Sequence, residues 1–182
     1  QLMKDFPSTR LSKSAMSNFD IENKSKSTRI LRELNPKPIT YKEFMFYESC
    51  HNSGMMTFND SFKNVEIESY GYDFSGYYPF LLACHNFKIP IKEGKRKKLK
   101  KLKFDNLEYG IYKVKISCDS NKFKRLFMFS REHTYTHYSL EFAYINKDKY
   151  DIKFELDLES DYNALVYSED KLVDSSKIFK DW

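Results

Sequence analysis

An alternating stretch at residues 109–116 constrains the fold of this chain more than any other feature of its sequence. Two sets of side chains alternate along this stretch: Ile111, Lys113 and Lys115 in one set, and Tyr112, Val114 and Ile116 in the other. A period of two puts neighbouring side chains on opposite faces of a strand. The pattern therefore predicts a strand.

Shorter patterns predict the remaining elements. Strands are expected over 55–58, 67–72, 126–130, 138–144, 150–158 and 164–167, and helices over 80–87 and from residue 175 onward. Residues 8–19 are expected to be a polar loop that runs into a short helix, and residues 21–37 a connector or a loosely packed helix such as 28–34. Residues 41–46 form a short aromatic run. Mixed strands with a few helices predict an α+β fold.

Composition excludes some classes of protein. Aromatic residues make up 17% of the 182, which excludes a disordered chain. Three separated cysteines without a C-x-x-C pair favour a reduced, intracellular protein. The longest apolar run, residues 77–84, is too short to span a bilayer, so no membrane partner is expected. Gln1 at the start and an amphipathic stretch at the end lead us to expect a piece of a larger protein.

The segment from Tyr70 to Pro79 carries the chemistry. An aspartate, Asp73, follows an apolar stretch, a short turn comes next, and Pro79 suits the first turn of a helix because its missing N–H is not needed there. Backbone N–H groups at a helix start attract phosphate oxygens. A carboxylate beside a phosphate requires a bridging Mg²⁺, which is the assembly of two-metal phosphoryl transfer.

Residues 73–79, with the sequence D-F-S-G-Y-Y-P, resemble motif A of family B DNA polymerases, D-x-x-S-L-Y-P. The resemblance implies that Asp73 binds both catalytic Mg²⁺ ions. It implies that the backbone of Ser75, Gly76, Tyr77 and Tyr78 holds the triphosphate of the incoming dNTP, and that Tyr78 excludes a ribose 2′-hydroxyl. Gly76 replaces the usual serine and Tyr77 the usual leucine, which leaves the backbone role intact.

The flanking residues resemble the protein-primed subgroup of this family, found in phages, linear plasmids, mobile elements and viruses. Ser53 and Gly54 occupy the place of its Y-x-G-G motif, which contacts template DNA, and Gly54 matches. Residues 14–19 resemble the segment after the exonuclease domain. Residues 163–167 and 179–182 resemble the end of the subgroup's insertion between motifs A and B, which touches the terminal protein and the primer end.

This resemblance implies a partial polymerase palm of antiparallel strands and a few helices, with an inserted α/β subregion. The expected parts are a linker (1–40), the palm segment (41–123), the insertion (124–174) and the start of a helix toward the fingers (175–182). The expected partners are DNA template and primer, dNTP and a terminal protein. The chain contains no K-x-x-x-N-S-x-Y-G and no D-T-D, so it is expected to be inactive alone.

A basic run at residues 95–103 predicts phosphate contacts, with Lys95, Arg96, Lys97, Lys98, Lys100 and Lys101 as candidate DNA-binding residues. The alternative is a solvated loop held by Leu99 and Leu102. Two rival functions follow from the same features. One is a non-catalytic domain that binds single-stranded nucleic acid through the basic run and exposed aromatics, and the other is a decayed polymerase with a structural role.

Simpler interpretations exist for each candidate residue. Asp73 may be read as a helix N-cap, and Tyr77 is expected in the core. His133 and His137 have the spacing of a helical metal pair, but the residues between them favour a strand, where positions four apart lie about 13 Å apart. The Cys50-His51 and Cys84-His85 doublets have poor spacing for zinc.

Overall fold

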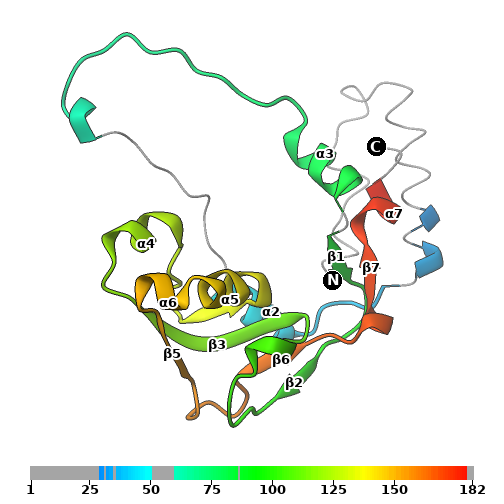
Figure 1. Ribbon diagram of the computed structural model, residues 1–182. Coiled ribbons are helices and arrows are strands. Elements are labelled where there is room, and N and C mark those ends of the chain that lie inside the picture. Colours follow the sequence, from blue (N-terminus) through cyan, green and yellow to red (C-terminus); the bar gives the residue numbers. More distant parts are fainter. Residues whose placement is uncertain (1–28, 31, 35, 51–59, 86, 180–182) are drawn as a thin grey trace.

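The computed structural model describes residues 29–30, 32–34, 36–50, 60–85 and 87–179. The fold is α+β with antiparallel sheets, as the sequence predicts (Figure 1). The helices are α2 (Tyr41–Ser49), α3 (Tyr77–Cys84), α4 (Asn121–Leu126), α5 (His137–Ile145), α6 (Lys147–Tyr150) and α7 (Ser175–Phe179). The strands are β1 (Lys88–Pro90), β2 (Lys95–Lys97), β3 (Gly110–Ser117), β4 (Thr134–Thr136), β5 (Lys153–Leu156), β6 (Ala164–Val166) and β7 (Leu172–Asp174).

The larger sheet has the strand order β2-β6-β3-β4, and β5 pairs with the second half of β3. A smaller sheet pairs β1 with β7, and α3 packs on α7 beside it (Figure 1). The predicted strands at 109–116, 150–158 and 164–167 are confirmed as β3, β5 and β6. The helix expected from residue 175 is confirmed as α7, and the described part of 28–34 is helical, with Arg29 and Glu33 forming an exposed ion pair.

Strand β3 lies at the centre of the core. Tyr112, Val114 and Ile116, one of the two alternating sets, are buried in the main hydrophobic cluster. Ile111 is also buried, on the opposite face, where it packs with Phe46 of α2. The sheet is therefore covered on both faces at the start of β3, and its outer face becomes polar only from Lys113 onward.

Gly110 permits the closest approach in the sheet. A Cβ atom at this position would lie 2.2 Å from the backbone oxygen of Leu165, which is far inside van der Waals contact. Only glycine therefore lets the first residue of β3 pair with β6 in this register.

Two of the predicted strands are wrong because the segments are helical or irregular. Residues 138–144 lie within α5, whose Thr136 accepts a hydrogen bond from the Ser139 N–H and so caps the first turn. His137, Leu140 and Ala143 form its buried face, at a helical spacing of three. Leu126 is the last residue of α4, and residues 127–130 form neither helix nor strand. Phe127, the C-cap residue, stacks on Phe123 one turn earlier with ring centroids at 5.1 Å.

The strand predicted over 67–72 is also wrong. Residues 65–74 form no strand or helix, and their side chains are exposed. Figure 1 shows this stretch arching away from the larger sheet before it reaches α3. We call residues 60–76 the arm. The strand expected over 55–58 and the helix over 8–19 lie outside the described residues.

Helix α2 is fixed to the sheet through a buried carboxylate. Thr40 and Glu43 form a reciprocal capping box at its start. Glu43, only 4% exposed, also accepts hydrogen bonds from the Gly94 N–H (2.8 Å) and the Tyr167 hydroxyl (2.9 Å). These bonds join α2 to the residues beside β2 and β6, so the carboxylate is satisfied without a cation.

The side chain of Asn163 fastens the chain beyond β2 to the turn between β5 and β6. Its Oδ1 accepts from the Leu99 N–H at 2.7 Å, and its Nδ2 donates to the carbonyls of Leu99 (2.9 Å) and Asp157 (2.7 Å). Asn163 is fully buried, so its amide depends on these three backbone groups and not on water for its hydrogen bonds.

We predict that Asn163→Ala lowers the free energy of unfolding by about 3 kcal/mol, because it removes the three hydrogen bonds that a fully buried amide makes to the backbone of Leu99 and Asp157. The matched control is Asn146→Ala, since the exposed Asn146 amide donates one bond to the Phe142 carbonyl. That change is expected to cost less than about 0.5 kcal/mol. Urea unfolding followed by circular dichroism measures both, and equal losses would contradict the assignment.

Candidate functional site

Asp73 lies in the arm, three residues before the N-cap of α3, and is exposed. The N-cap residue is Gly76, at a left-handed φ of 66°, and no side chain caps the helix. The simpler interpretation of Asp73 as the helix N-cap is therefore wrong. A Cβ at Gly76 would meet no atom, so its glycine is required by the backbone angle and not by crowding.

The backbone between Asp73 and α3 turns tightly. The Tyr77 N–H donates to the Phe74 carbonyl at 3.2 Å, and the Phe80 N–H donates to the Gly76 carbonyl at 2.9 Å. Within the described residues, the N–H groups of Ser75, Gly76 and Tyr78 have no hydrogen-bond partner. The helix starts at Tyr77 with Pro79 in its first turn, which confirms the proline's predicted place, although the helix begins three residues earlier than expected and ends at Cys84.

Three aromatic rings follow Asp73 in sequence and touch in space. The rings of Phe74 and Tyr77 lie 5.9 Å apart, and those of Tyr77 and Tyr78 lie 5.8 Å apart, edge to face. Tyr78 is 77% exposed and Tyr77 is 48% exposed. The expectation that Tyr77 belongs to the core is therefore wrong, because about half of its side chain is exposed and no residue of α3 is buried.

Asp73 is the one carboxylate that this turn offers to a metal ion. Nearby on the arm, the Tyr70 hydroxyl donates to Glu68 Oε1 at 3.0 Å. Among the described residues, no three His, Cys, Asp or Glu side chains gather to hold a metal. Mg²⁺ binds through as few as one or two carboxylates when substrate phosphates and water supply its other ligands, and Asp73 fits that minimal role.

The basic run divides into two sets of side chains. Arg96 and Lys97 lie in β2, where Arg96 stacks over the Tyr162 ring at 4.7 Å and Lys97 pairs with Glu108. Lys98 donates to the carbonyls of Leu158 and Ser160. Lys95, Lys100 and Lys101 are exposed and have no such partner in the described part of the chain. Residues 95–97 are thus a strand and not the solvated loop of the simpler interpretation.

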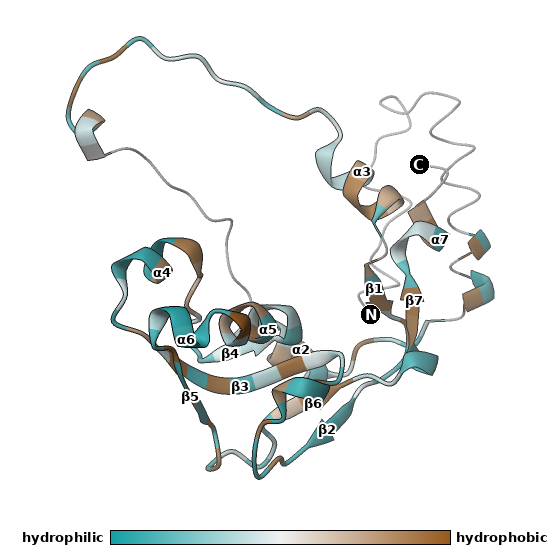
Figure 2. Cartoon of the chain, in the orientation of Figure 1, coloured by the Kyte–Doolittle hydropathy of each residue, from teal (hydrophilic) through white to brown (hydrophobic). Residues whose placement is uncertain are grey.

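The structure does not bring Asp73 and the basic run together. Asp73 leads into α3, whereas β2 lies at the far side of the larger sheet (Figure 1). Figure 2 shows the same division in hydropathy, with apolar residues along α3 and a hydrophilic β2. Ser53 and Gly54, the other predicted DNA contacts, lie outside the described residues.

The histidines predicted to be separated by a strand are separated by β4. His133 is exposed, with φ at 52°, whereas His137 is buried between the rings of Tyr109 (4.4 Å) and Tyr138 (3.8 Å). His137 Nδ1 lies 3.3 Å from both the N–H and the carbonyl oxygen of Gly110. The buried ring is therefore a packing group of the sheet edge.

Cys84 is exposed at the end of α3, and Cys50 is half-buried beyond α2. Burial raises the pKa of the Cys50 thiol to about 11, which keeps it protonated and unreactive at neutral pH. His51, its neighbour in sequence, lies outside the described residues.

Sequence reasoning missed three residues that shape these surfaces. Glu43 had a recognisable signal, because T-x-x-E at residues 40–43 is the capping-box pattern. Asn163 and Tyr162 had none, because their partners Leu99 and Arg96 lie more than sixty residues away in sequence.

Comparison with known proteins gives no relative. No family model, no curated protein and no solved structure matches this chain. None of the described helices combines the length and apolar character that crossing a bilayer requires.

We predict that stability falls on acidification because of His137. Burial lowers its pKa below the ordinary 6.5, outweighing the Gly110 backbone bond and Glu141, which raise it. A lowered pKa means that the folded state prefers the neutral ring. The stabilisation is therefore complete above pH 6.5 and is lost as the pH falls below it, by at most about 1.4 kcal/mol per pH unit.

Urea unfolding between about pH 7.5 and 5.5 measures this dependence. His137→Gln is expected to remove it, whereas the control His133→Asn, at an exposed position that tolerates a positive φ, is expected to keep it. If the free energy of unfolding of the His137→Gln variant still fell on acidification, a group other than His137 would be responsible for the pH dependence.

Proposed function

We propose that this chain is part of a family B DNA polymerase of the protein-primed type, which adds deoxynucleotides to DNA by two-metal phosphoryl transfer. The observation that carries the proposal is the turn from Asp73 to Pro79. Its sequence resembles motif A, and in the structure an exposed carboxylate precedes a helix start with open backbone N–H groups. Open N–H groups at a helix start beside a carboxylate are suited to hold a metal-bound phosphate.

In this proposal Asp73 holds Mg²⁺ against the triphosphate. Mg²⁺ bound there would neutralise charge at the transferring phosphorus and would lower the pKa of the attacking primer hydroxyl. Asp73 itself would orient the ion. The second carboxylate of a two-metal site comes from outside this chain, which has no D-T-D sequence.

The N–H groups of Ser75, Gly76 and Tyr78 are the donors available to triphosphate oxygens. Tyr77 is the exception in this set, since its N–H is occupied by the Phe74 carbonyl. Gly76 has a left-handed φ at this turn, and the start of α3 adds its positive dipole end.

Tyr78 is the proposed steric gate against ribonucleotides. Its ring is exposed and rests edge-on against Tyr77, which restrains it without covering its outer face. Pro79 fixes the backbone immediately after it. A restrained ring beneath the sugar rejects a 2′-hydroxyl by collision, which water cannot compensate.

The partners under this proposal are a DNA template and primer, dNTP and a terminal protein, within a viral, plasmid or mobile-element replicon. Residues 124–174 are the proposed contact region for the terminal protein, and Ser53 and Gly54 are proposed to contact template DNA. The partial palm then consists of residues 41–123.

The second candidate is a non-catalytic nucleic-acid-binding protein. The observation that favours it is the set of exposed lysines on a packed sheet, far from Asp73. The two candidates differ in a simple way, because only the polymerase requires the Asp73 carboxylate.

We predict that Asp73→Ala in the polymerase containing this chain abolishes primer extension with Mg²⁺ and dNTP, while folding and 3′–5′ exonuclease activity stay near normal. The loss follows from removal of the metal ligand. Primer extension on a gel measures it. The matched control is Glu68→Gln on the same arm, which should extend primers normally. An active Asp73→Ala enzyme would refute the assignment.

We predict that Tyr78→Val lowers the discrimination between dNTP and rNTP at least about a hundredfold, which corresponds to roughly 3 kcal/mol. Extension with dNTP should drop much less, mainly through a higher KM. The measurement is kcat/KM for a matched dNTP and rNTP. Retained sugar selectivity in an active Tyr78→Val enzyme would limit the motif A assignment to Asp73.

A further inference from the structure

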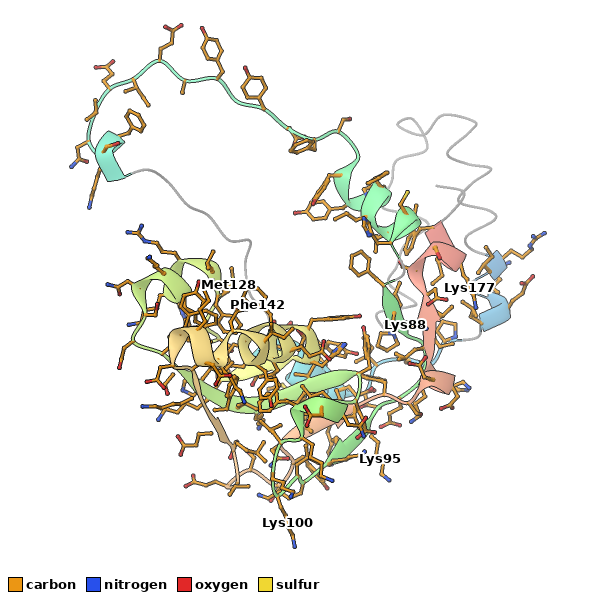
Figure 3. The ribbon with its side chains drawn as sticks, viewed as in Figure 1. Lys88, Lys95, Lys100, Met128, Phe142 and Lys177 are labelled. Atoms are coloured by element: carbon orange, nitrogen blue, oxygen red, sulfur yellow. The ribbon has the colours of Figure 1, made fainter. Side chains whose placement is uncertain are left out.

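The loop that follows β2 displays lysines by anchoring the residues between them. Leu99, Leu102 and Phe104 point inward and pack against the main hydrophobic cluster. Lys100, Lys101 and Lys103, which alternate with them, are exposed. Figure 3 shows Lys100 projecting away from the ribbon at the outer end of this loop. The lysine backbone positions are therefore set by burial of their neighbours.

Two further contacts hold the loop in place. Asn163 bonds both the N–H and the carbonyl of Leu99, so the backbone just before Lys100 is fixed to the sheet. At the other end, the Phe104 ring stacks on Tyr144 of α5 with centroids 4.1 Å apart and planes within 5°. A loop held at both ends loses little backbone entropy when its side chains bind a partner.

The charges on this loop differ from other lysines in the sheets. Lys88, Lys97, Lys115 and Lys153 each pair with a carboxylate. By contrast, the side-chain ammonium groups of Lys95, Lys100, Lys101 and Lys103 have neither an ion pair nor a hydrogen bond within the described ranges. Residues 92–103 hold eight lysine or arginine side chains against the single carboxylate of Glu93.

Two carboxylates stand near this surface, on the turn between β5 and β6. Glu159 and Asp161 are exposed, whereas Asp157 turns inward and accepts the N–H groups of Glu159 and Ser160. The Lys98 ammonium group donates hydrogen bonds to two backbone carbonyls of the same turn, those of Leu158 and Ser160. The loop therefore keeps a positive excess on its outer side, bounded by an acidic turn, and a repeating anion such as a phosphodiester backbone fits a row of spaced cations.

An aromatic ring lies at the edge of this surface. Tyr162 is 42% exposed and its ring is held by the guanidinium of Arg96 at 4.7 Å. A ring fixed on one side by a cation and partly open on the other is suited to stack on a base. No comparable feature is needed by a surface that binds only small anions.

We propose that Lys95, Lys100, Lys101 and Lys103 form a preorganised surface that binds the phosphodiester backbone of DNA. Arg96, Lys97 and Lys98 do not contact phosphate directly, because their side chains are engaged within the sheet. The surface is separate from Asp73, and the proposal holds for a polymerase and for a non-catalytic binding protein alike.

The test measures the salt dependence of DNA binding by the full chain, using fluorescence anisotropy between about 50 and 200 mM KCl. The probes are an oligothymidylate and a duplex of mixed sequence. Replacing Lys100, Lys101 and Lys103 together by Gln should flatten the plot of log K against log salt. The expected change is about 2.7 on duplex DNA, near 0.9 per lost contact, and about 2.1 on the single strand.

Two controls separate a defined surface from general attraction. The charge-preserving Lys100→Arg, Lys101→Arg, Lys103→Arg variant should keep the original slope. Replacing Lys122, Lys124 and Arg125 of α4 by Gln removes the same charge elsewhere and should change the slope much less. Equal flattening by the loop and α4 variants, or an unchanged slope in the loop variant, would overturn the proposal.

Discussion

The backbone of β3 forms hydrogen-bonded ladders along both of its edges, and the larger sheet is assembled around it. One edge pairs with β6 and then with β5, and the other pairs with β4. Gly110 makes the first pairing possible because any side chain would strike the Leu165 carbonyl. Helices α2 and α5 can then cover opposite faces, since the apolar side chains at the start of β3 point both ways.

The arm lacks both the backbone pairing and the side-chain burial that stabilise β3. Its apolar side chains are exposed, with Tyr72 at 95% and Phe74 at 81%, and residues 66–73 form no backbone ladder within the described part of the chain. Exposing apolar side chains of an extended segment to water is unfavourable in free energy unless another surface binds and buries them. The proposed polymerase accounts for this, because a nucleotide, a primer terminus and further palm residues would all meet the chain at Asp73.

The parts of the fold that sequence predicted are those with strong local signals. Alternation at Tyr112, Val114 and Ile116 reports a buried face directly, and Pro79 marks a helix start. Residues 138–144 were predicted wrongly because Tyr, Phe and Leu at every second position imitate the pattern of a strand. The helix N-cap at Thr136, which marks the start of α5, is a weaker sequence signal. Asn163 could not be found, because a lone asparagine carries no mark of the distant backbone that it bonds. The same contrast between local and long-range features applies to the candidate site. The turn at Asp73 is a local motif, but which lysines are engaged depends on partners such as Glu108 and Ser160.

Amide hydrogen exchange on the intact protein tests the central claim that the arm, and not the sheet, is where nucleotide is bound. Without substrates, amides of β3 should be strongly protected and those of residues 73–78 should exchange rapidly. Adding primer–template, dNTP and Mg²⁺ together should slow exchange at Ser75, Gly76 and Tyr78, and omitting either dNTP or Mg²⁺ should remove that effect. Unchanged exchange at these three amides under all conditions, in a protein that still binds DNA, would contradict the account.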